Sequence, residues 1–96
     1  MPRLTWTETA RADLRDINRW LEREASPEVA IRMLASIRTR ADFLLEFPHG
    51  GRPILDQDFR LLRVHDTPYL ISYRILESGI EILRIHHERT AWREDQ

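Results

Sequence analysis

The chain has 96 residues, a formal net charge of −1 and no cysteine. This length supports one domain, which we place over residues 1–96. The lack of cysteine excludes disulfides and thiolate chemistry and is typical of a reducing compartment, so we predict a cytoplasmic protein. No apolar run approaches the roughly 20 residues of a membrane span, and the near-neutral charge excludes a broadly basic, nonspecific nucleic-acid binder. All 15 basic side chains are arginines, whose planar groups suit carboxylate or phosphate.

The N-terminal half predicts one short strand and two helices. Residues 4–6 have the composition of a strand, and Thr7 can cap a helix over residues 8–24, where apolar side chains recur at steps of three and four. Ser26 and the proline after it provide a second helix start, and this helix must end before Pro48. Because only a short connection separates the two helices, we expect an antiparallel helix hairpin.

After residue 51 the apolar pattern changes to the alternation that is typical of β-strands. Segments near 59–65, 69–76 and 80–86 are rich in β-branched and aromatic residues and are separated by turn residues. They predict a three-stranded antiparallel meander. The predicted fold class is therefore α+β: a short N-terminal strand, a helix hairpin and a meander, with both helices packed on one face of the sheet.

The turn between the last two strands predicts a register. Gly79 can adopt the left-handed conformation that a three-residue loop over residues 77–79 requires, so Leu76 would pair with Ile80. On the open face this register places three facing pairs: Arg74 with Ile82, Ser72 with Arg84, and Leu70 with His86. The opposite face is apolar and is expected to receive the helices; it holds Ile71, Tyr73, Ile75, Leu83 and Ile85.

The loop through residues 66–68 decides which further arginine joins the open face. A loop of three residues would align Arg60 with Arg74, whereas a loop of two would bring Arg63 there instead. In both cases about three guanidinium groups would gather, which is typical of a site for a polyanion or a carboxylate. The alternatives are a solvated face or ion pairs with neighbouring acids, namely Asp56, Asp58, Glu77 and Glu81.

Two histidines end the last predicted strand. His86 and His87 are neighbours on a strand and point to opposite faces, so they cannot readily share an ion, and we predict no metal site. One of them could act as a general acid or base beside the arginines; the alternative is a surface histidine without a catalytic role. The sequence has no motif for covalent catalysis or nucleotide binding, and we predict no cofactor.

A row of arginines lies along the first predicted helix. Its members recur every four residues and so share one face: Arg11, Arg15, Arg19 and Arg23. Acids three positions away favour a solvated, salt-bridged face, and the alternative is an acidic partner. Trp20 lies at the edge of the apolar stripe of this helix. Trp92 lies in a polar tail, where it either packs back on the sheet or anchors a partner.

Five segments of the chain together carry a family resemblance. They are Thr7-x-x-Ala10-x-x-Asp13-Leu14-x-x-Ile17, Phe47-Pro48-x-x-Gly51-Arg52-Pro53, Arg60-Leu61-Leu62-Arg63-Val64, Pro68-Tyr69-Leu70-Ile71-Ser72-Tyr73-Arg74 and Ile80-Glu81-Ile82-Leu83-Arg84-Ile85-x-His87. In this order they closely resemble the RelE/ParE family of bacterial toxins from type II toxin–antitoxin pairs. The resemblance implies a growth inhibitor silenced by a cognate antitoxin, through which alone it reaches operator DNA. Our candidates for the antitoxin contact are Arg11, Arg15, Arg19, Trp20 and Arg23.

The family divides into two activities. RelE-like members cut mRNA on the ribosome, and the residues for this alternative would be Arg60, Arg74, Arg84, His86 and His87. ParE-like members poison DNA gyrase without known hydrolytic chemistry. Two departures favour the ParE-like branch: Leu70 stands where the ribonuclease branch often has arginine, and the chain has no lysine. The predicted target-binding residues, for gyrase or for the ribosome, are Arg60, Arg63, Arg74, Arg84, His86 and Trp92.

Overall fold

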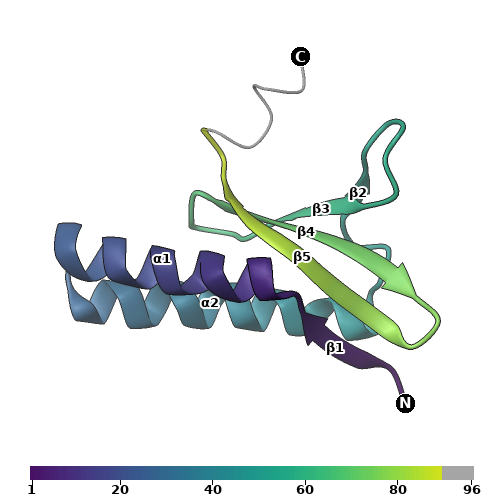
Figure 1. Cartoon of the computed structure of the whole chain (residues 1–96), viewed down its shortest axis with the longest axis horizontal. Helices are drawn as coiled ribbons and strands as arrows, with labels where there is room; N and C mark the ends of the chain where they lie inside the picture. Colours follow the sequence, from purple (N-terminus) through teal and green to yellow (C-terminus); the bar gives the residue numbers. More distant parts are fainter. Residues whose placement is uncertain (90–96) are drawn as a thin grey trace.

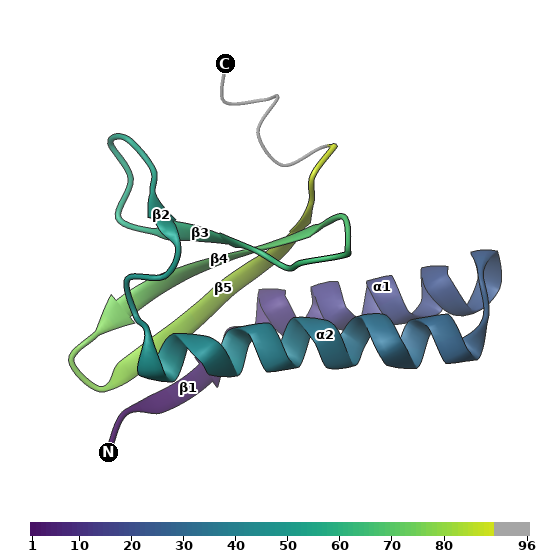
Figure 2. The same cartoon turned by 180° about the vertical axis from the view of Figure 1, so that it is seen from behind.

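The computed structural model describes residues 1–89, which form two helices and five strands (Figure 1). In chain order the elements are β1 (Arg3–Trp6), α1 (Glu8–Glu24), α2 (Pro27–Glu46), β2 (Arg52–Pro53), β3 (Arg60–Arg63), β4 (Tyr69–Leu76) and β5 (Gly79–His87). The sheet order is β1-β5-β4-β3-β2, and both helices lie against one face of the sheet (Figure 2). The predicted α+β class, with its helix hairpin and β3–β4–β5 meander, is confirmed. At the two edges, β1 adds in parallel to β5 and β2 adds antiparallel to β3.

Side-chain caps start both helices. The Thr7 hydroxyl oxygen accepts a hydrogen bond from the N–H of Ala10 at 3.0 Å, which satisfies one of the unpaired donors at the start of α1. Ser26 accepts in the same way from the N–H of Val29 at 3.1 Å, and a proline opens α2. α2 ends before Pro48. The predicted bounds of the hairpin are therefore confirmed.

The predicted register of the β4–β5 hairpin is wrong at its turn. Leu76 pairs with Gly79, so the loop has two residues instead of three, and Arg74 faces Glu81 instead of Ile82. Gly79 has a φ of 143° and lies against the backbone of β1, where a Cβ atom would come within 2.1 Å of a carbonyl oxygen. The glycine is needed for this close approach of β1, which the local turn signal does not contain.

A β-bulge at Leu83 returns the hairpin to the predicted register. Beyond the bulge the facing pairs are those predicted, Ser72 with Arg84 and Leu70 with His86. Before the bulge the residues of β5 lie on the opposite faces to those predicted, whereas the residues of β4 keep the predicted faces. Ile82, expected on the open face, is fully buried against the helices. Ile75 stays on the helix side, where it pairs with Ile80, but it is 41% exposed.

The connection between β3 and β4 places Arg63, and not Arg60, on the open face. A backbone hydrogen bond of 3.0 Å closes a loop of four residues, 65–68, instead of two or three. Because side chains alternate along a strand, a loop of four residues orients β3 in the same way as the predicted loop of two. Arg63 therefore faces Leu70 on the open side. Arg60 faces Tyr73 on the helix side, so the alternative that aligned it with the open-face arginines is wrong.

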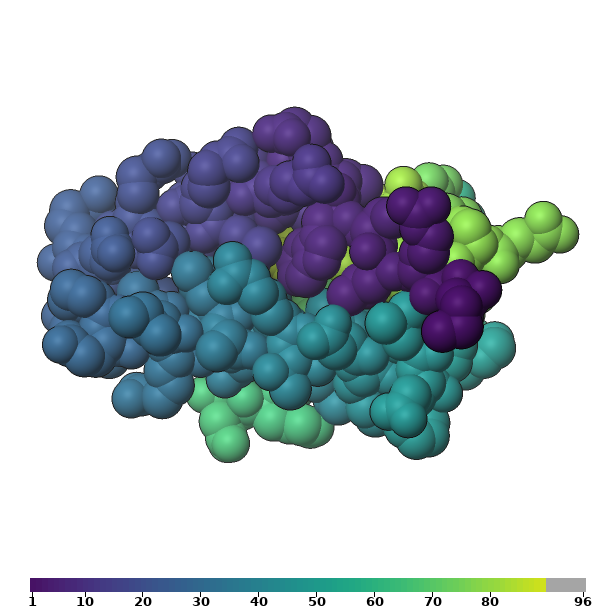
Figure 3. All heavy atoms as spheres, turned by 90° about the horizontal axis from the view of Figure 1, so that it is seen from below, coloured from purple at the N-terminus to yellow at the C-terminus, as the bar shows by residue number. Residues whose placement is uncertain are grey.

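The apolar core lies between the sheet and the helices. Its largest fully buried side chains are Tyr73, Ile37, Leu44, Ile71, Ile82 and Val64. From below, α1 and α2 lie side by side and cover most of this face of the sheet (Figure 3). Neither helix of residues 1–89 has the length and apolarity that a membrane crossing requires.

Candidate functional site

The open face is the surface of β3, β4 and β5 that points away from the helices. Its predicted site residues are Arg63, Arg74, Arg84 and His86, with Ser72 among them. Of the other predicted target-binding residues, Arg60 lies on the helix side. Trp92 lies outside the described residues.

Two open-face arginines are held by carboxylates on the sheet or beside it. Arg74 donates from Nε at 3.1 Å and from Nη2 to the same oxygen of Glu81, and its Nη1 lies 3.5 Å from Asp58. The hydrogen bonds that Arg74 donates to Glu81 raise the pKa of Arg74 above its ordinary value, so the group stays charged. Arg63 donates to Glu88 at 2.6 Å. Among the alternatives for this face, ion pairing is the arrangement that both arginines adopt.

The third open-face arginine is held by α1. Arg84 donates to both carboxylate oxygens of Asp13, from Nε at 3.2 Å and from Nη2 at 2.9 Å. Asp13 is 13% exposed and also accepts the backbone N–H of Ile85 at 2.9 Å. The Thr7 hydroxyl donates to the carbonyl oxygen of Leu83 at 2.8 Å. We name these five residues the α1–β5 seam; there, the hydrogen bonds that Arg84 donates to Asp13 raise the pKa of Arg84.

Arg60 and Tyr73 hold the chain that leads into β2. The Tyr73 hydroxyl accepts the N–H of Gly51 at 2.8 Å and donates to the carbonyl oxygen of Pro48 at 2.7 Å. Arg60 donates to the carbonyl oxygen of Gly51 at 2.7 Å. A Cβ at Gly51 would lie 2.6 Å from the tyrosine ring, so only glycine fits. Burial raises the pKa of Tyr73, against the opposing effects of the Gly51 hydrogen bond and the Arg60 charge. Arg60 therefore has a structural contact away from the open face.

The two histidines have different neighbours. His86 lies on the open face, with Nε2 3.0 Å from the hydroxyl oxygen of Ser72. His87 accepts the N–H of Arg89 at 3.1 Å and packs edge-on against Tyr69, with ring centroids 5.8 Å apart. In residues 1–89 no three or more His, Cys, Asp or Glu side chains gather closely enough to hold a metal ion.

The arginine row of α1 is exposed and paired with acids of the same helix. Trp20, which is 52% exposed, lines a hollow of about 310 Å³ between α1 and the sheet, together with Asp16, Ile17, Tyr69 and His87. Within the row, Arg11 and Arg15 pair with Glu8, Arg19 with Asp16, and Arg23 with Glu24. This is the salt-bridged face that was one alternative for the row, and it leaves Trp20 as the exposed apolar residue beside it.

Comparison with known proteins assigns the family. A sequence model of the ParE toxin of the type II toxin–antitoxin system parDE matches residues 4–92. The chain belongs to the ParE toxin family. This ParE-family chain is 38% identical over 90 residues to Y4kP, a candidate toxin of Sinorhizobium fredii, covering 94% of this chain and 92% of Y4kP. It is 37% identical over 87 residues to toxin RelE2 of Caulobacter vibrioides, covering 91% and 96% of the two chains.

Solved structures agree with this family. The ParE-family chain is similar to one from the chromosomal ParDE system of P. aeruginosa, with a TM-score of 0.81 and 29% identity over 91% of this chain and 96% of that one. A chain of the toxin–antitoxin complex RelBE2 from Mycobacterium tuberculosis gives a TM-score of 0.67 and 26% identity over 91% and 99%. The protein is a type II toxin–antitoxin toxin of the ParE/RelE family, as the resemblance implied.

Sequence reasoning assigned no role to Asp13 in this ParE-family toxin. Asp13 lies next to the buried Leu14 on α1, which brings its carboxylate near the core. A carboxylate that is largely removed from water needs hydrogen-bond donors, and this requirement was the available signal. The partners of Asp13 lie 71 and 72 residues away in the chain, so the sequence could not name them.

Proposed function

We propose that this toxin arrests bacterial growth by binding a protein target, DNA gyrase, and that a cognate antitoxin neutralises it. The observation that supports binding over cutting is the pairing of the open-face cations. Arg74 and Arg84 each donate two hydrogen bonds to one carboxylate group, and Arg63 pairs with Glu88. RNA cleavage needs cations directed at a phosphate and an acid–base pair at the same atom. Open-face arginines that are already paired with carboxylates therefore favour binding of a protein target over cleavage of RNA.

The residues of the ribonuclease alternative are divided between the two sides of the sheet. Arg74, Arg84 and His86 lie on the open face. Arg60 and His87 face Tyr73 and Tyr69, respectively, on the helix side. Because the sheet separates the two groups, one substrate atom cannot contact both. This division weighs against the cutting set as the sequence assembled it.

Ion pairs of this kind suit a protein-binding surface. The side chains of Arg63, Arg74 and Arg84 are 56%, 39% and 54% exposed, respectively, and their carboxylate partners fix their conformations. A fixed side chain loses less conformational entropy on binding than a mobile one. Polar groups held in this way also discriminate between partners by charge complementarity.

The antitoxin contact is proposed on α1. A relative whose structure was solved as a toxin–antitoxin complex supports an antitoxin as the partner, and the features of α1 support the location. The exposed Trp20 and the hollow beside it offer an apolar anchor, and the arginine row supplies charge around it. An aromatic anchor within a charged rim is typical of protein interfaces. The toxin would reach operator DNA only through the antitoxin.

Induced expression in a bacterium tests the target. We expect growth arrest with double-strand DNA breaks, intact messages, and inhibition of supercoiling by purified gyrase in the presence of the purified chain. Co-expression of the adjacent antitoxin reading frame should restore growth. Codon-linked mRNA cuts mapped by primer extension within minutes, with gyrase unaffected, would establish the ribonuclease alternative instead.

A double variant locates the working surface. Arg63→Gln with Arg74→Gln removes two open-face charges, and we expect loss of growth arrest and of gyrase inhibition. Folding should persist, because exposed ion pairs contribute about 1 kcal/mol or less each. The matched control is Arg3→Gln with Arg38→Gln, which removes two charges from exposed positions elsewhere. Equal toxicity of the test and control variants at equal abundance would remove the open face from the proposal.

A further inference from the structure

The outer side of α2 carries a hollow that the proposed target and antitoxin contacts do not use. It has a volume of about 500 Å³, lies between α2 and the β3–β4 loop, and has a largely apolar lining. Its polar and aromatic residues are Arg32, Ser36, Thr39, Arg40, Phe43 and His65. None of the residues that line it is acidic.

The two arginines of this hollow have donors that the described chain does not use. Arg40 donates from Nε to the carbonyl oxygen of Arg63 at 2.9 Å, and its guanidinium carbon lies 4.6 Å from the ring centroid of Phe43. These contacts orient the group and leave both of its Nη atoms without a partner in residues 1–89. Arg32 is exposed and makes no ion pair or hydrogen bond to the described part of the chain. Oriented guanidinium groups without carboxylates are binding groups for anions.

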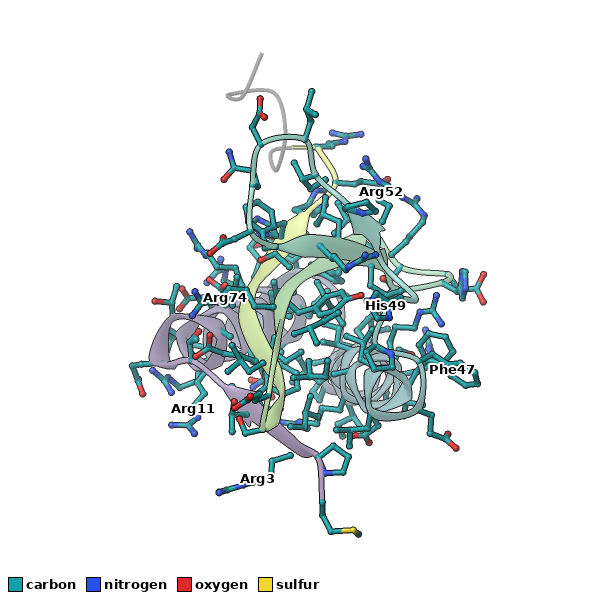
Figure 4. All side chains as sticks on the ribbon, turned by 90° about the vertical axis from the view of Figure 1, so that its right-hand side faces the viewer. Arg3, Arg11, Phe47, His49, Arg52 and Arg74 are labelled. Atoms are coloured by element: carbon teal, nitrogen blue, oxygen red, sulfur yellow. The ribbon has the colours of Figure 1, made fainter. Side chains whose placement is uncertain are left out.

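Aromatic side chains extend the hollow towards the end of α2. Phe43 and Phe47 stack with ring centroids 4.9 Å apart, and Phe47 is 55% exposed. Figure 4 shows Phe47 on the α2 side of the molecule, on the opposite side from Arg74. An exposed aromatic stack next to charged groups is typical of an interface anchor.

We propose that this α2 surface, formed by Arg32, Arg40, Phe43, Phe47 and His65, binds an acidic segment of a partner protein. Carboxylates of the segment pair with Arg32 and Arg40, and an apolar side chain of the segment packs on the phenylalanine stack. The charge of the hollow and its apolar lining both fit this occupant. The inference does not depend on the identity of the toxin's target.

A nucleic-acid strand fits this surface less well. Binding to a phosphate backbone is strong when six to ten or so cations contact successive phosphates. The α2 surface has two arginines and one histidine, and the chain as a whole has a net charge of −1. The apolar lining also matches an amphipathic peptide better than a phosphate chain.

Fluorescence anisotropy with the purified full chain tests the proposal. The probe is a short labelled peptide of glutamate, alanine and phenylalanine; the comparison probes are the same peptide with glutamine for glutamate and an oligothymidylate of equal length. We expect saturable binding of the acidic peptide alone. Arg32→Gln with Arg40→Gln should raise its Kd about tenfold, and Phe47→Ser should also weaken it. The charge-matched control, Arg3→Gln with Arg38→Gln, should change the Kd by less than about twofold.

Three results would overturn the proposal. They are the absence of saturable binding of the acidic peptide, an equal loss in the control variant, and tighter binding of the oligothymidylate that the same variants abolish. Arg40 also contacts Phe43 and β3, so its variant is checked by thermal unfolding. Arg32→Gln alone removes no contact within residues 1–89 and keeps the test valid if the double variant unfolds; we expect a rise in Kd of about threefold.

Discussion

The arginines of α1 each pair with an acid of their own helix, whereas on the outer side of α2 Arg32 and Arg40 have no carboxylate partner within residues 1–89. The α1–β5 seam continues the first pattern, because Arg84 is held by Asp13. The same residue type therefore has two uses in one small protein. Where carboxylates are near, the arginine is held in one conformation before a partner binds; where they are lacking, its donors are open to the carboxylates of a partner.

The β-bulge gives a physical reason for the difference. A bulge leaves backbone groups outside the regular ladder, and a buried N–H without a partner is costly. Asp13 accepts the N–H of Ile85 beyond the bulge, and the charge of this carboxylate is then balanced by Arg84. Arg32 and Arg40 have no such carboxylate beside them in residues 1–89.

The largest effect is expected from breaking the bulge register. Ile82 lies between the turn and the bulge, pairs with Tyr73 and is fully buried. Ile82→Ala should destabilise the fold by about 3–4 kcal/mol through lost burial and a cavity. The control Ile75→Ala, at a side chain that the sequence register buries and the structure exposes by 41%, should cost less than about 1 kcal/mol. Urea unfolding followed by circular dichroism measures both, and the reverse order would contradict the bulge.

The next effect is expected at the carboxylate of the seam. Asp13→Ala leaves the N–H of Ile85 and the charge of Arg84 without their acceptor, and should cost about 2–3 kcal/mol. Asp16→Ala, which removes an acid whose side chain is 69% exposed, should cost about 0.5 kcal/mol or less. Thermal or urea unfolding separates the two variants. Similar losses for both acids would show that the seam is not a distinct structural anchor.

The third effect is expected at Tyr73, a buried residue whose hydroxyl is neutral and can be compared with the charged groups of the seam. Tyr73→Phe removes the hydroxyl that contacts Gly51 and Pro48 and should cost about 1–2 kcal/mol at neutral pH. Burial raises the pKa of Tyr73 above 10.0, so this group's contribution is complete below pH 10.0 and is lost as the pH rises through the folded-state pKa. Unfolding between neutral and alkaline pH should therefore show a smaller decline for the variant. An identical decline in both proteins would contradict this assignment.

The smallest effect is expected on the α2 surface. Arg32→Gln should leave the free energy of unfolding within about 0.5 kcal/mol of the wild type, because the side chain has no partner in residues 1–89. The same urea titration measures it, with Arg84→Gln as the paired counterpart that should lose more. A large loss for Arg32→Gln would mean that this arginine stabilises the fold.

Local signals were sufficient for the helices. Thr7 and Ser26 start α1 and α2 because their hydroxyls accept N–H groups of the first turn, and this chemistry is visible in the sequence. For the β3–β4 loop the sequence left two alternatives open, and a loop with an even number of residues, which places Arg63 on the open face, was one of them. The pairing of Arg74 with Asp58 and Glu81 was also among the alternatives, since acids close in sequence could be named.

The features that the sequence did not predict depend on contacts between distant segments of the chain. The turn at Gly79 is set by β1, and the bulge at Leu83 is held by Thr7 from a position 76 residues earlier. Neither contact changes the alternation of side chains that the sequence displays. The unpaired state of Arg32 and Arg40 likewise follows from the placement of acids elsewhere on the fold, which composition cannot reveal.

Exchange of the arginine Nε–H protons, observed in ¹⁵N-correlated spectra and assigned with single Arg→Lys variants, tests the central claim most directly. The account predicts that Arg74 and Arg84, whose Nε groups donate to carboxylates, exchange about tenfold or more slowly than Arg32. Equal exchange rates for Arg84 and Arg32 would contradict the division between paired and available arginines.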